Sequence, residues 1–119
     1  MKSKSTRRLI PRMRVLCGDD IALGPGKVDL LALVGRTGSI REAAERMGMS
    51  YMRAWTLIQM MNACFRQPLV AASRGGKKRG GATLTITGKK ALELYRSLET
   101  QSLQACSGTW QELRKLLHP

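Results

Sequence analysis

The chain has 119 residues, a length that suits one domain with a modest hydrophobic core. Its formal net charge of +13 favours a polyanionic partner, because basic side chains that neutralise phosphates release condensed counterions. Five aromatic residues are too few for a broad platform on which single-stranded bases stack, and the single histidine, His118, excludes a Cys/His zinc site and a histidine-based triad. We therefore expect a protein that is not an enzyme and holds no metal or cofactor.

The start of the chain predicts a flexible basic arm over residues 1–11, followed by a single domain over residues 12–119. Pro11 interrupts the short apolar pair before it, and no run of signal-peptide or membrane-spanning length follows. The three cysteines are odd in number and far apart, which argues against a disulfide framework and suits apolar filling in a reducing compartment. We expect a cytoplasmic protein with no membrane partner.

Residues 13–23 predict a short β-hairpin, because apolar residues alternate on both sides of the turn Gly18-Asp19-Asp20. Gly24-Pro25-Gly26 closes this hairpin. The nearly continuous apolar run from Val28 to Val34 then predicts a buried first helix with Gly35 as its C-cap.

Two further helices follow in close succession. The segment Ser39-Ile40-Arg41-Glu42 is a capping box, and the apolar residues after it repeat at helical spacing up to Met47. Gly48 ends this helix, and Ser50 caps the next one, which should end before Pro68. On the helix that Ser50 caps, the apolar stripe consists of Ala54, Ile58, Met61 and Phe65. This pattern predicts a helix-turn-helix, whose second helix enters the major groove of DNA.

A second hairpin is predicted after the helix-turn-helix. Residues 69–73 and 82–86 favour strands, and the glycine-rich, basic sequence RGGKKRGG lies between them. No acidic residue lies between Glu45 and Glu93, whereas a solvated protein surface normally mixes positive and negative side chains. A last helical region begins at Thr87 and is expected to break at Ser107-Gly108. The fold class is therefore α+β, mainly α, with a winged helix-turn-helix.

The ordered pattern resembles the N-terminal DNA-binding domain of the ModE-type molybdate-responsive transcriptional regulators, and more weakly the winged domain of LysR-type regulators. The resemblance covers roughly residues 12–98. It is carried by Gly38-Ser39-Ile40, Ala43-Ala44, Ser50-Tyr51, Ala54-Trp55, Met61-Asn62, Leu84-Thr85 and Gly88. It implies a homodimer on a palindromic operator, paired through the N-terminal hairpin and a C-terminal dimerisation helix. In that family separate C-terminal domains sense molybdate, and we expect no such sensor in this chain.

The predicted DNA-binding residues lie on the two helices and on the tip of the wing: Ser39, Ser50, Tyr51, Met52, Arg53, Thr56, Arg74, Lys77, Lys78 and Arg79. Arg53 is the leading specificity residue, because an arginine can pair with guanine O6 and N7, and Thr56 can meet a thymine methyl. Ser50 caps its helix, and its hydroxyl could also hold a phosphate. The four wing cations suit backbone or minor-groove contact; the alternative is a merely solvated loop.

Two other side chains allow more than one interpretation. Tyr51 either contacts DNA or packs beside the wing, and Trp55 is better interpreted as the edge of the core than as a base contact. The sequence thus predicts a sequence-specific regulator that binds double-stranded DNA, with a link to molybdenum metabolism implied by the resemblance. The alternatives are a sequence-tolerant nucleic-acid-binding module and a protein-interaction module that uses the same fold.

Overall fold

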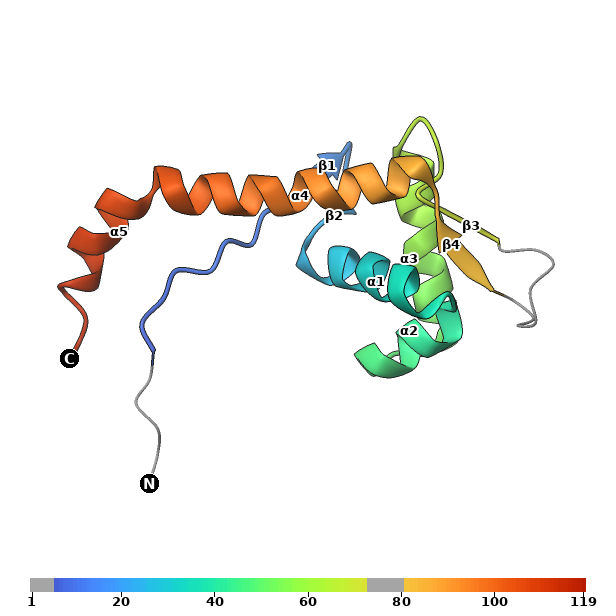
Figure 1. The fold of residues 1–119 in the computed structure, drawn as a ribbon, viewed down its shortest axis with the longest axis horizontal. Coiled ribbons are helices and arrows are strands. Elements are labelled where there is room, and N and C mark those ends of the chain that lie inside the picture. Colours follow the sequence, from blue (N-terminus) through green and yellow to red (C-terminus); the bar gives the residue numbers. More distant parts are fainter. Residues whose placement is uncertain (1–5, 73–80) are drawn as a thin grey trace, which may run out of the picture.

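A hairpin, three helices, a second hairpin and two more helices follow one another along the chain (Figure 1). The structure is a computed structural model that describes residues 6–72 and 81–119. The elements are β1 (Val15–Cys17), β2 (Asp20–Leu23), α1 (Pro25–Thr37), α2 (Ile40–Met47), α3 (Tyr51–Cys64), β3 (Val70–Ala72), β4 (Ala82–Leu84), α4 (Ile86–Ala105) and α5 (Ser107–Arg114). The predicted fold class, a mainly helical winged helix-turn-helix, is confirmed.

The two hairpins are separate antiparallel sheets of two strands each. In the first, Cys17 pairs with Asp20 across a turn in which Gly18 has a φ of +63°. In the second, which forms the wing, Val70 pairs with Leu84 and Ala72 pairs with Ala82. The wing strands are shorter than the sequence predicted, so that Ile86 belongs to α4 and not to β4. The reason is Thr85, whose hydroxyl accepts a hydrogen bond of 2.9 Å from the N–H of Gly88 and thereby starts the helix.

The first helix differs from the prediction at both ends. It begins at Pro25, because a proline at the first helical position has no N–H to leave unpaired and already holds a helical φ. It continues through Gly35 to Thr37 and ends at Gly38, whose φ is +70° and whose N–H donates to the carbonyl of Val34. Gly35 is therefore not a C-cap. A Cβ at Gly35 would lie 2.9 Å from Leu84 Cδ1, so this glycine makes room for the second wing strand.

The hydrophobic core lies between α1, α2, α3, the wing strands and the first part of α4. Its largest fully buried side chains are Tyr95, Leu30, Leu31, Ile58, Met61, Leu69, Val28 and Val34. Tyr95 belongs to α4, and its hydroxyl donates a hydrogen bond of 2.7 Å to the carbonyl of Met13. Burial raises the pKa of Tyr95, so the phenol keeps its proton for this bond. The tyrosine thus fixes the start of the first hairpin against α4.

Beyond Tyr95, α4 extends away from the helical body and carries α5 at its far end (Figure 1). The predicted break near Ser107-Gly108 is confirmed, since α4 ends at Ala105 and α5 begins at Ser107. Within residues 6–72 and 81–119, no helix combines the length and the hydropathy needed to cross a membrane. The predicted boundary at residue 11 between a flexible arm and the domain stays a prediction.

Candidate nucleic-acid interface

A tight turn joins α2 and α3 as the sequence predicted. The hydroxyl of Ser39 accepts a hydrogen bond of 3.0 Å from the N–H of Glu42 and starts α2. Gly48 ends α2 with a φ of +69°, a conformation that glycine adopts without steric cost. The hydroxyl of Ser50 then accepts a hydrogen bond of 3.1 Å from the N–H of Arg53 and starts α3. Both serines cap helices; their contact with DNA stays a prediction.

The helix α3 turns one side to the core and leaves its first turns open to solvent. Ala54, Ile58 and Met61 are buried, as the predicted stripe requires. On the opposite side Met52 is 63% exposed, and Thr56 is exposed as well. Side chains in the first turns of a recognition helix are those that reach base edges. Among the residues that the structure describes, none covers the side chains of Met52 and Thr56.

Tyr51 and Trp55 face the base of the wing. Both border a shallow depression of about 190 Å³ together with Gln59, Ala72 and Ala82. The guanidinium of Arg41 lies 5.2 Å from the centre of the Tyr51 ring, which is cation–π geometry and draws α2 towards the start of α3. Trp55 keeps 42% of its surface exposed and borders the depression beside the core residue Ile58, so it lies where the open face between helix and wing meets the core.

The wing is held to the helix-turn-helix at its base. The N–H of Ala82 donates a hydrogen bond of 3.0 Å to the carbonyl of Gly38, and Ser39 forms an isolated antiparallel bridge with Gly81. These contacts join the second wing strand to the turn before α2. The predicted contacts at the tip of the wing, Arg74, Lys77, Lys78 and Arg79, lie outside the described residues and stay predictions.

Asn62, near the end of α3, fixes the first wing strand. Its Oδ1 accepts hydrogen bonds from the N–H of Leu69 (2.8 Å) and of Val70 (3.2 Å), and its Nδ2 donates to the carbonyl of Val70 (3.1 Å). The side chain therefore satisfies the backbone of β3 as a third strand would. Asn62 sets the distance between the recognition helix and the wing.

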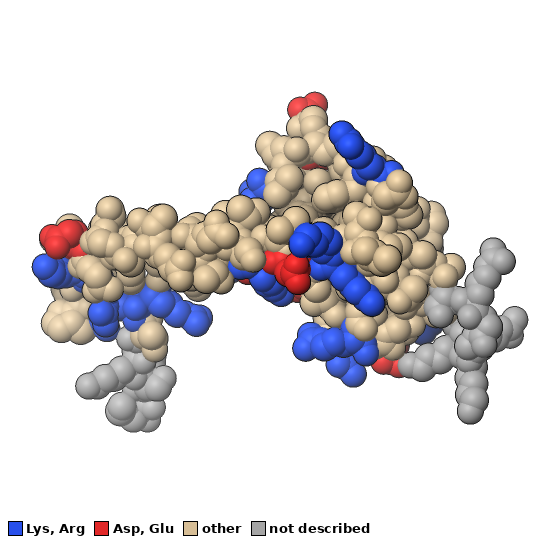
Figure 2. All heavy atoms as spheres, turned by 45° about the horizontal axis from the view of Figure 1, so that its top comes forward, with Lys and Arg blue, Asp and Glu red and all other residues tan. Residues whose placement is uncertain are grey.

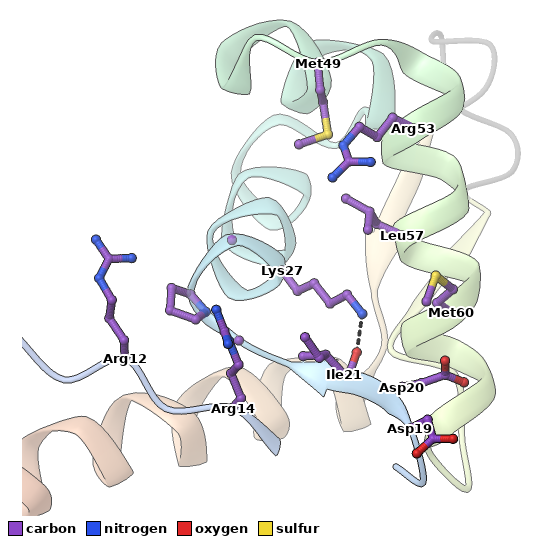
Figure 3. A pocket seen from close by; sticks show the side chains of 13 residues that line it. Arg12, Arg14, Asp19, Asp20, Ile21, Lys27, Met49, Arg53, Leu57 and Met60 are labelled. Carbon is purple, nitrogen blue, oxygen red and sulfur yellow. Dashed lines mark hydrogen bonds between the residues drawn. The ribbon is translucent and has the colours of Figure 1, made fainter. Parts of the chain in front are cut away.

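A basic groove of about 600 Å³ runs along the side of α3 that faces the start of α1 (Figure 3). Four cationic side chains line it, Arg12, Arg14, Lys27 and Arg53, together with two carboxylates, Asp19 and Asp20. Lys27 donates a hydrogen bond to the carbonyl of Ile21, which holds it along the groove. Arg12, Arg14 and Arg53 form no ion pair with any other residue that the structure describes. Their positive charge remains available to DNA beside the first turns of α3.

Sequence reasoning found the helix caps and the exposed face of α3 but missed two groups of residues. Asn62 was noted only as part of the motif Met61-Asn62 that carries the family resemblance. Its structural role was missed, because its hydrogen-bond partners follow it across a loop and show no periodicity in the sequence. The grouping of Arg12, Arg14 and Lys27 beside Arg53 was also missed, because the hairpin and α1 bring together residues far apart in the chain.

Basic side chains also gather on the outer surface of the body, whereas the face of α4 that is turned to the viewer in Figure 2 carries few charged side chains. An ion pair between two exposed side chains, such as Lys90 with Glu93 at 3.3 Å, is of little energetic weight.

Comparison with known proteins also indicates a winged helix-turn-helix. Residues 27–89 match the family model of bacterial regulatory helix-turn-helix proteins of the lysR family. The winged-helix fold is shared with the DNA-binding domain of CbnR, solved as a complex with DNA; the match has a TM-score of 0.55 at 22% identity and covers 76% of this chain and 95% of that one.

Among curated relatives, the molybdenum-pterin-binding protein MopB of Rhodobacter capsulatus is 47% identical over 77 residues, which are 65% of this chain and 28% of that protein. The molybdenum transport protein ModE of Azotobacter vinelandii is 33% identical over 109 residues, 92% of this chain and 40% of that protein. The chain thus spans well under half the length of these relatives, and the resemblance to ModE is confirmed over that part. The segment that matches the lysR family model, residues 27–89, contains the helix-turn-helix and the base of the wing, and it takes up more than half of the chain. The chain therefore belongs to the lysR family of bacterial regulatory helix-turn-helix proteins.

Proposed function

We propose that this protein binds double-stranded DNA sequence-specifically as a homodimer and regulates transcription. The observation that carries the proposal is the arrangement of α3. Its first turns are exposed, and they adjoin the base of the wing on one side and the basic groove on the other. Such a helix can enter the major groove while flanking cations hold phosphates.

Within this arrangement the side chains divide by role. Met52, Arg53 and Thr56 face the base edges, with Arg53 as the main source of sequence preference. Ser39, Ser50 and Tyr51 lie at the helix starts, where backbone N–H groups and the helix dipole favour a phosphate. The wing cations Arg74, Lys77, Lys78 and Arg79 hold the backbone or the minor groove of the flanking DNA.

The homodimer is supported by the long helix α4, which exposes the leucines Leu94 and Leu98. Two copies related by a two-fold axis would read half-sites about one helical turn, roughly 34 Å, apart. The operator would then be palindromic.

The wider biology follows from the relatives and stays part of the proposal. ModE of Azotobacter vinelandii and MopB of Rhodobacter capsulatus carry molybdenum in their names, so the genes controlled by this chain would serve molybdenum metabolism. A regulator of this kind works on DNA in the cytoplasm and performs no catalysis.

The test is selection of bound fragments from random duplexes, followed by titration of the selected site against a scrambled duplex. We expect one palindromic consensus. Arg53→Ala should weaken binding to that consensus by at least tenfold and relax preference at one position per half-site, because a bidentate arginine–guanine pair contributes about 1–3 kcal/mol of discrimination.

Arg114→Ala is the matched control, since it removes the same charge from exposed α5, at the far end of the molecule from α3. It should leave the consensus unchanged. Equal affinity for the selected and the scrambled duplex would overturn the proposal in favour of sequence-tolerant binding, and absence of binding to any duplex would favour a protein-interaction module.

A further inference from the structure

The depression between α3 and the base of the wing is apolar and open to solvent. Its buried lining includes the core residues Ile40, Ile58 and Val70, and the exposed rings of Tyr51 and Trp55 border it on the side of α3. Among the residues that the structure describes, no charged side chain lines it. Pockets for organic ligands measure roughly 300–1,000 Å³, so a depression of about 190 Å³ suits one small apolar group instead.

The elements around the depression are fixed to one another. On the side of the second wing strand, Ser39 forms its antiparallel bridge with Gly81, and the N–H of Ala82 donates to the carbonyl of Gly38. On the side of the first wing strand, the hydrogen bonds of Asn62 hold the backbone of β3 against α3. The packing of the helix-turn-helix on the wing therefore sets the shape of the depression before any partner binds.

A cation lies beside the aromatic side of the depression. The guanidinium of Arg41, in the first turn of α2, is 5.2 Å from the centre of the Tyr51 ring. Arg41 is exposed and forms no ion pair with any other residue in the described part of the chain. The first helix of a helix-turn-helix crosses the DNA backbone, so a cation at this place can reach phosphates.

One strand of DNA backbone fits this arrangement. If α3 occupies a major groove and the wing meets the neighbouring minor groove, the strand that separates the two grooves passes over the gap between helix and wing. This strand alternates apolar deoxyribose rings with charged phosphates. An apolar depression with a cation beside it matches one sugar and one neighbouring phosphate.

We propose that Arg41, Tyr51 and Trp55 bind the DNA backbone between the two grooves, with the two rings against one deoxyribose and Arg41 on an adjacent phosphate. The inference rests on the proposed function, since it takes α3 to lie in the major groove. Contacts of this kind position the recognition helix and read no base. The sugar covers Trp55, and neutralisation of the phosphate by Arg41 releases a counterion.

The first experiment measures the exposure of Trp55 on the selected duplex. The chain has two tryptophans, so Trp110→Phe leaves the indole of Trp55 as the remaining one. We expect acrylamide to quench the fluorescence of this variant without DNA and to lose most of that effect on the duplex. Trp55→Phe is the matched control, because its remaining indole, Trp110 in α5, should be quenched equally in both states. A Trp55 that stays open to acrylamide on the bound duplex would overturn the proposal.

Affinity and its salt dependence separate the two contacts. Trp55→Ala should bind the selected duplex about tenfold more weakly, with the same consensus and the same salt slope, because the lost contact is apolar. Arg41→Ala should lower the salt slope by about 0.9 per protomer, whereas Arg41→Lys should keep it. Arg114→Ala should match the natural protein in both affinity and slope.

Melting temperatures of the free variants check that each one folds, and Trp55→Phe, which keeps an aromatic ring, should retain most of the affinity. Loss of preference for one base in Trp55→Ala would make Trp55 a base contact and contradict the proposal, as would an unchanged salt slope in Arg41→Ala. If the natural protein binds every duplex equally, the proposed specificity fails, while protection of Trp55 still supports the backbone contact. Absence of binding to any duplex overturns both.

Discussion

Asn62 joins α3 to the first wing strand through three hydrogen bonds with the backbone of Leu69 and Val70. The groups it satisfies are partly buried, and the two residues that carry them are themselves buried. A substitution that removes these bonds leaves two N–H groups and one carbonyl without partners. Leaving buried polar groups unpaired costs more free energy than losing a hydrogen bond that water can replace.

Asn62→Ala should therefore lower the free energy of unfolding by about 2–3 kcal/mol, measured by urea denaturation. Asn62→Asp is the control, since its carboxylate keeps both bonds from the N–H groups and loses only the bond that Nδ2 donates. We expect Asp to cost less than Ala. Equal losses for the two variants would mean that the backbone of β3 finds other partners.

Ser50 has two possible roles that substitutions at this one position can separate. As an N-cap it stabilises α3 by accepting the N–H of Arg53, and as a phosphate ligand it would lie against DNA. Ser50→Ala should cost about 1 kcal/mol of stability. Ser50→Asp should restore stability, because aspartate caps equally well and suits the helix dipole.

On DNA the two variants should differ in the opposite sense. A carboxylate at position 50 repels phosphate, so Ser50→Asp should bind the selected duplex at least tenfold more weakly than Ser50→Ala in an anisotropy titration at one fixed salt concentration. If Ser50→Asp binds DNA as well as the natural protein, Ser50 is a cap alone.

These single residues also show what a sequence can and cannot predict. The roles of Ser39 and Ser50 as caps follow from a spacing of three residues between the hydroxyl and its N–H partner, so local patterns were sufficient. The partners of Asn62 lie beyond a loop, and those of Tyr95 lie at the other end of the chain. Only the folded chain brings such groups together.

At the scale of elements, two glycines allow helices to approach the wing strands closely. A Cβ at Gly88, in the first turn of α4, would lie 2.1 Å from the carbonyl oxygen of Leu69. This atom belongs to the backbone at the start of the wing and cannot move aside as a side chain can. The corresponding contact at Gly35 is with the end of the flexible Leu84 side chain.

Gly88→Ala should destabilise the protein by about 3 kcal/mol or more, because α4 must shift away from the wing. Gly35→Ala should cost less, since Leu84 can rotate and alanine favours the helix by about 1 kcal/mol. Gly26→Ala, at a helical position with nothing near its Cβ, should be neutral or slightly stabilising. Thermal or urea unfolding of the three variants would establish this order, and a Gly88 variant as stable as the Gly26 variant would contradict it.

The boundaries of these elements explain where the sequence was misleading. Gly35 looked like the end of a helix because it follows an apolar run, yet the helix continues to Thr37 and Gly38 ends it. Ile86 continued the alternation of a strand, but Thr85 starts α4 one residue earlier. In both cases the residue that misled the prediction, Gly35 or the strand-like Ile86 after Thr85, has its place because a helix packs against the wing. The local sequence pattern holds no information about that packing.

For the whole molecule, the order of elements was predictable, since caps, turns and periodicity each mark one helix or strand. The spatial relation of α4 to the rest was not, because it depends on the burial of Tyr95 between the first hairpin and the core. That contact directs the remainder of α4 away from the body (Figure 1), and the face of the helix that Figure 2 shows carries few charged side chains.

The exposed face of α4 leads to the last prediction, which concerns self-association. Leu94 and Leu98 lie one turn apart, and they are 52% and 46% exposed. If this face pairs two copies, replacing both leucines with glutamine should raise the dimer dissociation constant by at least tenfold, because each buried leucine contributes about 1.5–3 kcal/mol. Sedimentation equilibrium measures this constant directly.

Leu103→Gln is the control, because Leu103 projects roughly half a turn round the helix from Leu94. It should leave the dimer intact. DNA binding gives a second readout: a palindrome should lose far more affinity than an isolated half-site when Leu94 and Leu98 are replaced, since only the palindrome engages both copies. A natural protein that sediments as a monomer at the highest concentrations used would place the pairing surface elsewhere and leave the half-site contacts of α3 to be tested alone.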